Sequence, residues 1–428
     1  MVIESLKYKI LQQFGFAPTQ EQGQALDTFV SFLTDRDPQA VMMLRGSAGT
    51  GKTSLSGAIV RTLLQIRQKV MLLAPTGRAA KVFSLGSGAP AYTIHRRIYR
   101  EKAFAGVDGQ FSLNDNLYTD TLFMVDEASM IANMGLGGTT FGSGCLLDDL
   151  VKFVYQGHND RLLLIGDKAQ LPPVGEEESP ALSASVMEGY GLKVYECDLN
   201  EVLRQSQSSG ILYNATLIRQ MITHDAVTGL PLIRFKGFAD IVMMPGAELV
   251  ESLGDSYHHV GMDETMVITR SNKRANIYNN GIRNMVLDRE EELSSGDMLM
   301  IVKNNYFWTE KEKKESGEGS AGAVPAFLAN GDRAKVLRVS NYIELYGFRF
   351  ATLLLQLPDY DDYEMQVTGM LDTLQSEAPA LTHEQQEELF RQVEEDYQHF
   401  VPLKADRMKS IRQDAYFNAL QIKYAYAV

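Results

Sequence analysis

The sequence predicts an α/β protein built on a parallel β-sheet flanked by helices. Short apolar runs alternate with helix-like segments through the first half of the chain, and polar, glycine- or proline-containing turns follow them. The strand-like runs are Val41–Leu44, Val70–Ala74, Leu122–Val125 and Leu162–Ile165. Ser54–Arg67 reads as a helix because Leu55, Ile59, Leu63 and Ile66 share one stripe. Ligands bind at the carboxyl ends of such strands, so the residues there are the functional candidates.

The first strand-like run is followed by a phosphate-binding loop. Residues 46–53 read Gly-Ser-Ala-Gly-Thr-Gly-Lys-Thr and match the pattern G-x-x-x-x-G-K-[ST] in full. A loop between a strand and a helix N-terminus points amide N–H groups at an anion, and the helix dipole adds to that field. Lys52 can reach the β- and γ-phosphates, and the Thr53 hydroxyl can ligate Mg²⁺. The pattern predicts a nucleotide and Mg²⁺ site made by Gly46, Ser47, Ala48, Gly49, Thr50, Gly51, Lys52, Thr53 and Ser54.

Two carboxylates, Asp126 and Glu127, follow the run Leu122–Val125. Beside the phosphate loop, Asp126 can hold Mg²⁺ through its hydration shell, and Glu127 can accept a proton from the attacking water. Two acids at a strand end also occur as a turn or a salt bridge. Their combination with the phosphate loop favours a role in hydrolysis.

The run Leu162–Ile165 leads into Gly166-Asp167-Lys168-Ala169-Gln170-Leu171-Pro172-Pro173-Val174. A glutamine at a strand end can hydrogen-bond both the γ-phosphate and the attacking water. A proline-stiffened turn is the alternative interpretation. The complete string favours the first, so Gln170 is a candidate for sensing hydrolysis.

Composition and charge bound the class of protein. The chain has 428 residues, an apolar fraction of 45% and a charged fraction of 22%, which suit a globular protein of two to four domains. No apolar run approaches a membrane span, and two cysteines fit a reducing cytoplasm. The net charge is −13, yet residues 51–100 hold nine basic and no acidic residues, which favours a phosphate-binding surface there. Residues 359–396 hold 12 acidic residues and one basic residue, interpreted as a solvated face.

These strings, in this order, resemble the 5′→3′ branch of superfamily 1 DNA helicases, the RecD-like and phage Dda-like enzymes. The resemblance covers about residues 15–340 and is highly specific as a set. The matching strings are Pro18-Thr19-Gln20, Gly46–Thr53, Ala74-Pro75-Thr76-Gly77-Arg78-Ala79-Ala80, Thr93-Ile94-His95, Asp126-Glu127-Ala128-Ser129-Met130, Gly166–Val174, Leu199-Asn200-Glu201-Val202-Leu203-Arg204-Gln205, Ile268-Thr269-Arg270-Ser271-Asn272 and Asn330-Gly331-Asp332.

The resemblance implies an ATP-driven motor in which two RecA-like domains grip single-stranded DNA and hold ATP between them. It implies that Gln20 reads adenine and that Arg204 contacts the γ-phosphate. In the first domain it implies DNA contacts by Thr76, Arg78 and His95, and in the second, contacts by Thr269, Ser271 and Asn272. A surface salt bridge for Arg78 and a structural role for His95 are the alternatives. The implied partners are single-stranded DNA and duplex junctions, and the implied process is DNA repair or recombination. A nuclease or repair complex is a further partner that the sequence leaves open. The sequence does not distinguish RNA from DNA as the polymer that is bound.

The resemblance also implies a domain organisation. Residues 1–215 form the first RecA-like domain, with a hairpin insert at about 96–118 that carries Phe104 and Phe111 as a duplex-splitting wedge or as a local core. Residues 216–329 form a second, incomplete RecA-like domain, and Thr265–Ile268 looks like the start of a strand in it. A small SH3-like β module with an acidic helical insertion spans 330–415, and a return strand begins in 416–428. Glu310–Val324 is polar and glycine-rich, so we expect a loop or linker.

The sequence ends at Val428, where relatives continue into two further motifs, one of which supplies an arginine to the ATP site. The resemblance therefore leads us to expect ATP binding with weak or absent hydrolysis and unwinding by this chain. Two alternatives stay open. One is a motor subunit of a helicase–nuclease complex, and the other is a nucleotide-dependent binding or regulatory module that changes shape without translocating.

Overall fold

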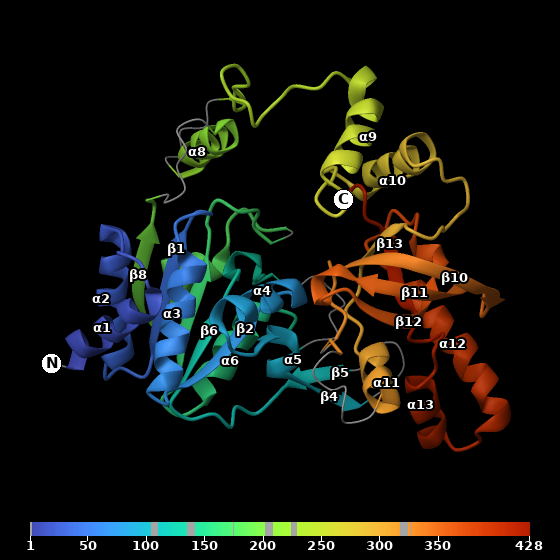
Figure 1. The fold of residues 1–428 in the computed structure, drawn as a ribbon. Helices are drawn as coiled ribbons and strands as arrows, with labels where there is room; N and C mark the ends of the chain where they lie inside the picture. Colours follow the sequence, from blue (N-terminus) through green and yellow to red (C-terminus); the bar gives the residue numbers. More distant parts are fainter. Residues whose placement is uncertain are drawn as a thin grey trace. The chain divides into compact units, whose positions relative to one another are not determined.

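The computed structural model describes residues 2–103, 110–134, 142–173, 175–201, 209–223, 229–316, 324–325 and 327–428. The described residues fall into two compact units (Figure 1). Residues up to Met243 form the first unit, and residues from Met244 onward form the second.

The first unit contains a six-stranded sheet with the order β3-β2-β6-β7-β1-β8. Its strands are β1 (Ala40–Gly46), β2 (Lys69–Ala74), β3 (Ala91–Thr93), β6 (Thr121–Val125), β7 (Arg161–Gly166) and β8 (Lys193–Leu199). All neighbouring strands in it run parallel, so their carboxyl ends meet at one edge. This confirms the predicted parallel sheet, and the four predicted strands are β1, β2, β6 and β7.

Helices cover both faces of this sheet, which explains why its central strands are apolar throughout. Met42 and Leu44 of β1 point into a core shared with the first four helices, whereas Val41 and Met43 point into a core on the other face. The helices of the first unit are α1 (Val2–Phe14), α2 (Gln20–Thr34), α3 (Lys52–Gln65), α4 (Gly77–Ser87), α5 (Ile94–Ile98), α6 (Leu146–Gln156), α7 (Ala184–Gly189) and α8 (Gly210–Thr223). Two 3-10 turns join them, η1 (Ala128–Met130) and η2 (Pro180–Leu182).

The insert expected at about 96–118 contains an antiparallel pair of strands, β4 (Tyr99–Ala103) and β5 (Gln110–Leu113). Tyr99 lies opposite Leu113 and Arg100 opposite Ser112. Phe104 lies outside the described residues, and so does the side chain of Phe111. The wedge assigned to these two aromatic residues therefore stays a prediction.

The second unit is organised around a closed barrel with the order β10-β11-β12-β13-β9 (Figure 1). Its strands are β9 (Met298–Ile301), β10 (Arg333–Leu345), β11 (Phe348–Leu357), β12 (Tyr363–Met370) and β13 (Leu420–Tyr424). The strands β10, β11 and β12 lie within the β module expected at 330–415. Its helices are α9 (Leu249–His259), α10 (Asn272–Gly281), α11 (Phe307–Ser316), α12 (His383–Phe400) and α13 (Lys404–Arg412), with shorter turns η3 (Gly246–Glu248), η4 (Ile282–Val286), η6 (Pro358–Tyr360) and η7 (Leu371–Thr373).

The structure divides the chain differently from the predicted boundaries at 215/216, 329/330 and 415/416. The start of the predicted second domain, residues 216–223, belongs to α8 and hence to the first unit. The predicted return strand in 416–428 instead closes the barrel, because β13 pairs with β9 and β12 and all five of its residues are buried. Thr265–Ile268 contributes only a single bridge, between Val267 and Ala427.

The expectation of a loop at Glu310–Val324 is wrong for its first part, because α11 continues to Ser316. Glutamate and lysine are good helix formers, and Asn305 accepts the N–H of Trp308 at 3.3 Å at the start of the helix. Trp308 is buried, and its indole N–H donates to the carbonyl of Asn418 at 3.0 Å. This anchor holds a segment whose surface is otherwise highly charged. None of the helices in the described parts of the chain has the length and apolar character required to cross a bilayer.

Candidate nucleotide-binding site

The phosphate loop leaves the end of β1 and turns back into α3. Gly49 and Gly51 both have a φ of 83°, which favours glycine. A Cβ atom on Gly46 would lie 2.8 Å from the carbonyl oxygen of Leu199 in the neighbouring β8. The backbone conformation and the close packing against β8 explain why glycine occupies these positions.

The loop presents polar groups suited to an anion. Gly51 is the N-cap of α3 and brings no capping side chain, so the amide groups of the first turn lack a side-chain cap. The Thr50 hydroxyl donates to the carbonyl of Ser47 at 2.8 Å, and the buried Ser47 hydroxyl has no hydrogen-bond partner among the described residues. An unsatisfied buried hydroxyl beside an uncapped helix N-terminus fits a bound phosphate group.

Lys52 folds over this loop. Its Nζ donates to the carbonyls of Gly46 at 2.6 Å and Ser47 at 2.9 Å. Burial lowers the pKa of Lys52, while the negative charges of Asp167, Glu127 and Asp126 act in the opposite direction. The ammonium group of Lys52 is therefore close enough to the acids that follow β6 and β7 to be stabilised by their negative charges.

A residue that sequence analysis missed, Gln22, supports the loop from α2. Its Nε2 donates to the carbonyl of Thr50 at 2.9 Å, and the side chain is 1% exposed. Gln22 also forms a capping box with Thr19, whose spacing of three residues is a recognisable signal at a helix start. Gln20, the residue predicted to read adenine, is exposed at the first position of α2. The contact with the phosphate loop thus comes from Gln22.

Asp126 and Glu127 emerge at the carboxyl end of β6, as the sequence predicted. Asp126 Oδ1 accepts the backbone N–H of Glu127 at 3.0 Å, and Glu127 has a φ of 52°. A non-glycine residue in this conformation is unusual and often belongs to a functional site. Burial raises the pKa of Asp126 to about 6, with a further contribution from the charge of Glu127. Asp126 therefore titrates close to neutral pH.

Gln170 lies after β7 and contacts the segment that follows β6. The buried Ser129 hydroxyl donates to Gln170 Oε1 at 2.9 Å. The nearby Glu176 carboxylate accepts the backbone N–H groups of Asn133 at 2.6 Å and Met134 at 2.8 Å. These contacts hold the two predicted hydrolytic segments together. Ser129 was part of a matching string, but no role was predicted for it.

An arginine from α8 reaches the same edge of the sheet. Arg219 Nη1 lies 3.0 Å from both carboxylate oxygens of Asp167, the residue directly after β7. Neither residue was predicted to act, because no local pattern connects two positions 52 residues apart. Arg204, the predicted γ-phosphate contact, lies outside the described residues. The segment leading to it is held at Glu201, whose N–H donates to Glu21 at 2.8 Å.

The predicted DNA-contacting residues of the first unit lie on α4 and α5. Thr76 is the N-cap of α4 and accepts the N–H of Ala79 at 3.2 Å, which leaves its hydroxyl hydrogen to donate. Arg78 is exposed on the first turn of α4. Burial lowers the pKa of His95, whose ring lies 5.7 Å from that of Tyr99. A neutral His95 suits a hydrogen bond better than an ion pair.

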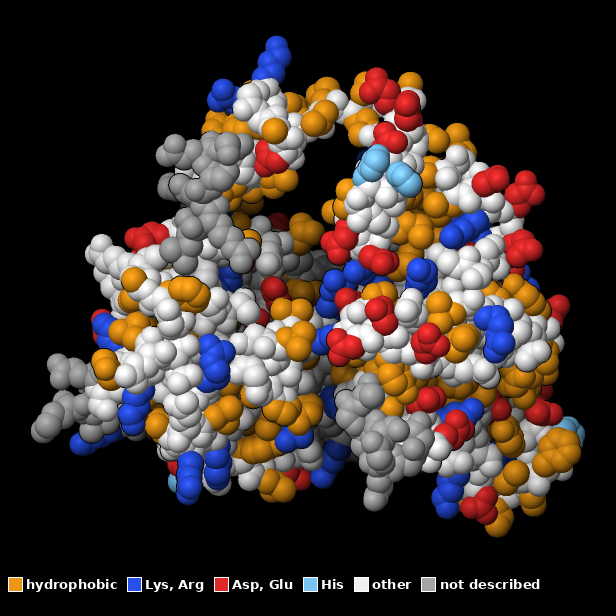
Figure 2. Space-filling view, in the orientation of Figure 1, with side chains coloured by type: hydrophobic (Ala, Val, Ile, Leu, Met, Phe, Trp, Pro, Cys, Tyr) orange, Lys and Arg blue, Asp and Glu red, His pale blue; other side chains and the backbone are white. Residues whose placement is uncertain are grey.

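The candidates of the second unit surround the start of α10. Thr269 donates to the carbonyl of Val428 at 3.1 Å, and Ser271 is the N-cap of α10. Asn272 donates to the carbonyl of Glu377 at 3.2 Å. Ser271 and Asn272 are exposed. On the face shown in Figure 2, the Lys and Arg side chains of the first unit are scattered among uncharged ones and do not merge into one basic patch.

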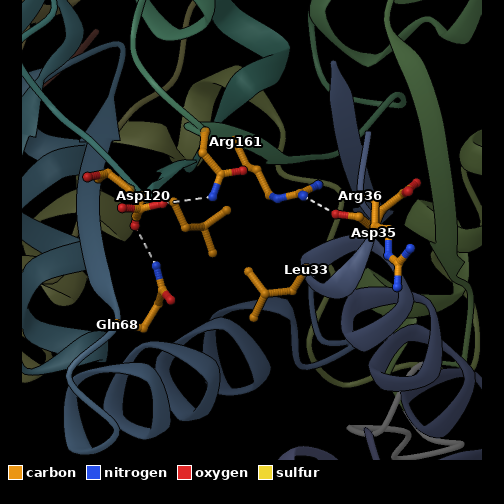
Figure 3. A pocket seen from close by; sticks show the side chains of 9 residues that line it. Leu33, Asp35, Arg36, Gln68, Asp120 and Arg161 are labelled. Atoms are coloured by element: carbon orange, nitrogen blue, oxygen red, sulfur yellow. Dashed lines mark hydrogen bonds between the residues drawn. The ribbon is translucent and has the colours of Figure 1, made fainter. Parts of the chain in front are cut away.

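A cavity of about 500 Å³ lies at the opposite edge of the same sheet, where β6 and β7 begin. In Figure 3, Gln68 and Asp120 lie on one side of it, and Leu33, Asp35 and Arg36 lie on the other. Gln68 donates to the carbonyl of Asp120 at 2.6 Å, and Arg161 donates to the carbonyl of Asp35. These polar groups already bind one another, and the phosphate loop is at the other end of the strands.

Comparison with known proteins identifies relatives of this arrangement. The AAA domain family matches residues 17–229. The ATP-dependent RecD2 DNA helicase of Deinococcus radiodurans is 30% identical over 157 residues, covering 36% of this chain and 18% of that protein. The ATP-dependent DNA helicase dda of Enterobacteria phage T4 is 25% identical over 267 residues, covering 60% of this chain and 55% of that protein. The matched regions thus span at most about half the length of these relatives.

Among solved structures, the Pif1 helicase from Bacteroides in complex with ADP-AlF3 and ssDNA aligns with a TM-score of 0.43 at 14% identity, over 82% of this chain and 74% of that one. The strand order of the sheet establishes the fold independently of this likeness.

Proposed function

We propose that this chain is a superfamily 1 helicase of the group that includes the RecD-like and Dda-like enzymes, and that it binds and hydrolyses ATP to move along single-stranded DNA. The observation that carries the proposal is the meeting of four elements at one sheet edge. These are the phosphate loop, the acids after β6, Gln170 after β7 and the supporting Gln22. A helicase must hold DNA without reading its sequence, and phosphate and stacking contacts serve that purpose.

In the proposed reaction, the loop amides, the Ser47 hydroxyl and Lys52 bind the phosphates. Thr53, which is exposed beside Lys52, and Asp126 would hold Mg²⁺, which neutralises phosphate charge when bound. Glu127 accepts a proton from the attacking water, and Gln170 hydrogen-bonds that water. The hydrogen bond from Ser129 fixes the oxygen end of the Gln170 amide. The NH₂ end of the amide can then donate a hydrogen bond to the γ-phosphate.

For the strand, we propose contacts by Thr76, Arg78 and His95 in the first unit and by Thr269, Ser271 and Asn272 in the second. The family resemblance favours 5′→3′ movement and a role in repair or recombination. The two cysteines, Cys145 and Cys197, are unpaired, which favours a reducing cytoplasm. A nucleotide-dependent switch, or a motor subunit beside a nuclease, uses the same ATP site and differs in what the second unit does.

The ATPase rate of the full chain with and without single-stranded DNA tests this proposal. We expect Lys52→Ala to abolish nucleotide binding or turnover. Lys69→Ala is the matched control, since Lys69 lies at the start of β2 and donates to Thr119 at 3.0 Å, away from the phosphate loop. Robust stimulation by single-stranded DNA supports the motor and contradicts the expectation of weak or absent hydrolysis. Hydrolysis that DNA leaves unchanged supports the switch. A Lys52→Ala variant that binds and hydrolyses ATP as the wild type does contradicts both.

A further inference from the structure

Arg219 brings a second cation to the phosphate site from a helix that no sequence motif identified. The side chain of Arg219 is 20% exposed and that of Asp167 is 8% exposed, so their ion pair is largely shielded from water. Both carboxylate oxygens contact the same guanidinium nitrogen at 3.0 Å. Burial strengthens the Coulombic attraction between the two groups and also removes water from both of them, so either group gains from a second polar partner.

Asp167 lies directly beside the phosphate loop. In the pairing of β1 with β7, Arg45 is opposite Gly166, so Asp167 follows β7 at the point where the loop leaves β1 after Gly46. Asp167 Oδ1 also accepts the N–H of Ala169 at 3.0 Å, which fixes the carboxylate. The charges of both Asp167 and Arg219 influence the pKa of Lys52. Arg219 is therefore within electrostatic reach of the lysine that binds the phosphates.

Helix α8, which carries Arg219, is hydrogen-bonded to the segment that follows it. Asp240 accepts the Ser209 hydroxyl at 2.6 Å and the Gly210 N–H at 2.7 Å at the start of the helix. Asn214 donates to the carbonyl of Arg234 at 2.9 Å. Residues 234–240 are thus tied to α8, and they precede Met244, the first residue of the second unit. Because of these hydrogen bonds, a shift of α8 that accompanies a change at Arg219 would also affect residues 234–240.

We propose that Arg219 binds the γ-phosphate of the nucleotide, with Asp167 as the carboxylate that holds its guanidinium in place, and so couples α8 to the nucleotide state. Guanidinium groups bind carboxylates and phosphates with the same planar set of donors, so a triphosphate can compete with Asp167 for Arg219. A diphosphate lacks the group that competes. The inference rests on the proposed ATP site, and it adds a residue and a helix to it.

The test measures the affinities of the full chain for ADP and for a nonhydrolysable ATP analogue in the presence of Mg²⁺. We expect Arg219→Ala to reduce the preference for the ATP analogue by about tenfold or more, with the affinity for ADP changed by less than about twofold. Arg219→Lys keeps the charge but loses the planar donors, so it should recover only part of the preference.

Two variants separate phosphate binding from a purely structural ion pair. Asp167→Asn removes the negative charge that pairs with Arg219 and keeps the arginine, so it should keep the preference for the ATP analogue. If the ion pair is purely structural, Asp167→Asn should instead lose that preference as Arg219→Ala does. Arg234→Ala removes a cation that lies over the rings of Tyr213 and Phe238, and it should leave the preference unchanged.

The outcomes distinguish this inference from the proposed function. If the wild type binds neither nucleotide, the ATP site itself is refuted. If the wild type prefers the ATP analogue and Arg219→Ala retains that preference, only the role of Arg219 is overturned. Equal weakening of ADP and the ATP analogue in Arg219→Ala also overturns it, because that result indicates damage to the fold of the site.

Discussion

The Ser129 hydroxyl donates to Gln170 Oε1 at 2.9 Å and thereby joins the segment after β6 to the segment after β7. One segment carries the acids that would activate water, and the other carries the amide that would detect the γ-phosphate. Ser129 is fully buried and Gln170 is exposed, so the contact is shielded from water on the side of the serine. The two segments are therefore positioned as one unit of the site.

Removing this contact should slow hydrolysis without weakening nucleotide binding. We expect Ser129→Ala to lower kcat by about tenfold, since one neutral hydrogen bond that orients Gln170 is lost. Gln170→Ala should lower kcat further, and the double variant should resemble Gln170→Ala alone because both act through one amide. Steady-state ATPase assays check this, and additive losses in the double variant would contradict it.

The variants Gln22→Ala and Gln20→Ala compare a glutamine that supports the phosphate loop with one that is predicted to read adenine. Gln22→Ala should weaken all nucleotides alike and lower the free energy of unfolding by about 1–2 kcal/mol, because the buried carbonyl of Thr50 loses its donor. Gln20→Ala should leave stability unchanged, since the side chain is exposed. If Gln20 reads adenine, its variant loses the preference for ATP over a pyrimidine triphosphate. Competition binding with both nucleotides measures this preference.

The protonation state of Asp126 should make the rate of ATP hydrolysis depend on pH near neutrality. Its pKa is raised to about 6, mainly by burial, and only the ionised carboxylate can hold Mg²⁺. Hydrolysis should therefore fall as the pH drops through about 6. The control is Lys69→Ala, which should follow the wild-type pH profile. A rate unchanged between pH 7 and pH 5 would contradict the assignment.

The same shift predicts the effect of Asp126 on stability. The folded-state pKa of Asp126 lies above that of an unfolded chain, so ionisation opposes folding above about pH 6. Asp126→Asn should therefore raise the free energy of unfolding by about 1–3 kcal/mol at pH 8. That gain should shrink as the pH falls through about 6 and disappear below about pH 3, where the wild-type carboxyl is protonated in both states. Urea unfolding at the two ends of this pH range measures the difference.

A buried carboxylate, Asp297, should control the stability of the second unit. It is 0% exposed, and it accepts hydrogen bonds from Arg283 at 3.1 Å, Arg289 at 2.7 Å and Tyr426 at 2.7 Å. Burial raises its pKa, but the bonds from these partners and from the Ser294 N–H outweigh that effect and hold the pKa below its usual value. Its stabilisation is therefore present above about pH 4 and is lost as the pH falls further.

Asp297→Asn should lower the free energy of unfolding by about 3–5 kcal/mol, because the buried Arg283 and the partly buried Arg289 lose their counter-charge. Hydrogen exchange of the β9 and β13 amides reports this loss directly. The exposed Asp362 provides the control, since Asp362→Asn should change protection by less than about 0.5 kcal/mol. Equal protection in the two variants would contradict the role of Asp297.

Local patterns predicted the parts of the site that lie in short segments of sequence. The four central strands are continuous apolar runs, and the phosphate loop and Asp126 follow two of them directly. β3 has only three residues, and β8 (Lys-Val-Tyr-Glu-Cys-Asp-Leu) mixes charged and apolar residues, so neither stood out. Arg219 could not be predicted because its role depends on a contact with Asp167 across 52 positions. The predicted domain boundaries cut through the barrel. They did so because the pairing of β9 with β13 joins segments that lie far apart in the sequence, and no local pattern shows such a pairing.

The pairing of Ile301 with Ile422 has a consequence for how the protein is made. During synthesis, β9 leaves the ribosome long before β13, and until then both β9 and β12 have unpaired backbone groups along one side. Such edges can recruit strands from other chains, and contacts between distant residues form slowly. Ribosome-bound chains should therefore be most vulnerable to aggregation and to chaperone capture in the interval before residues 420–424 emerge.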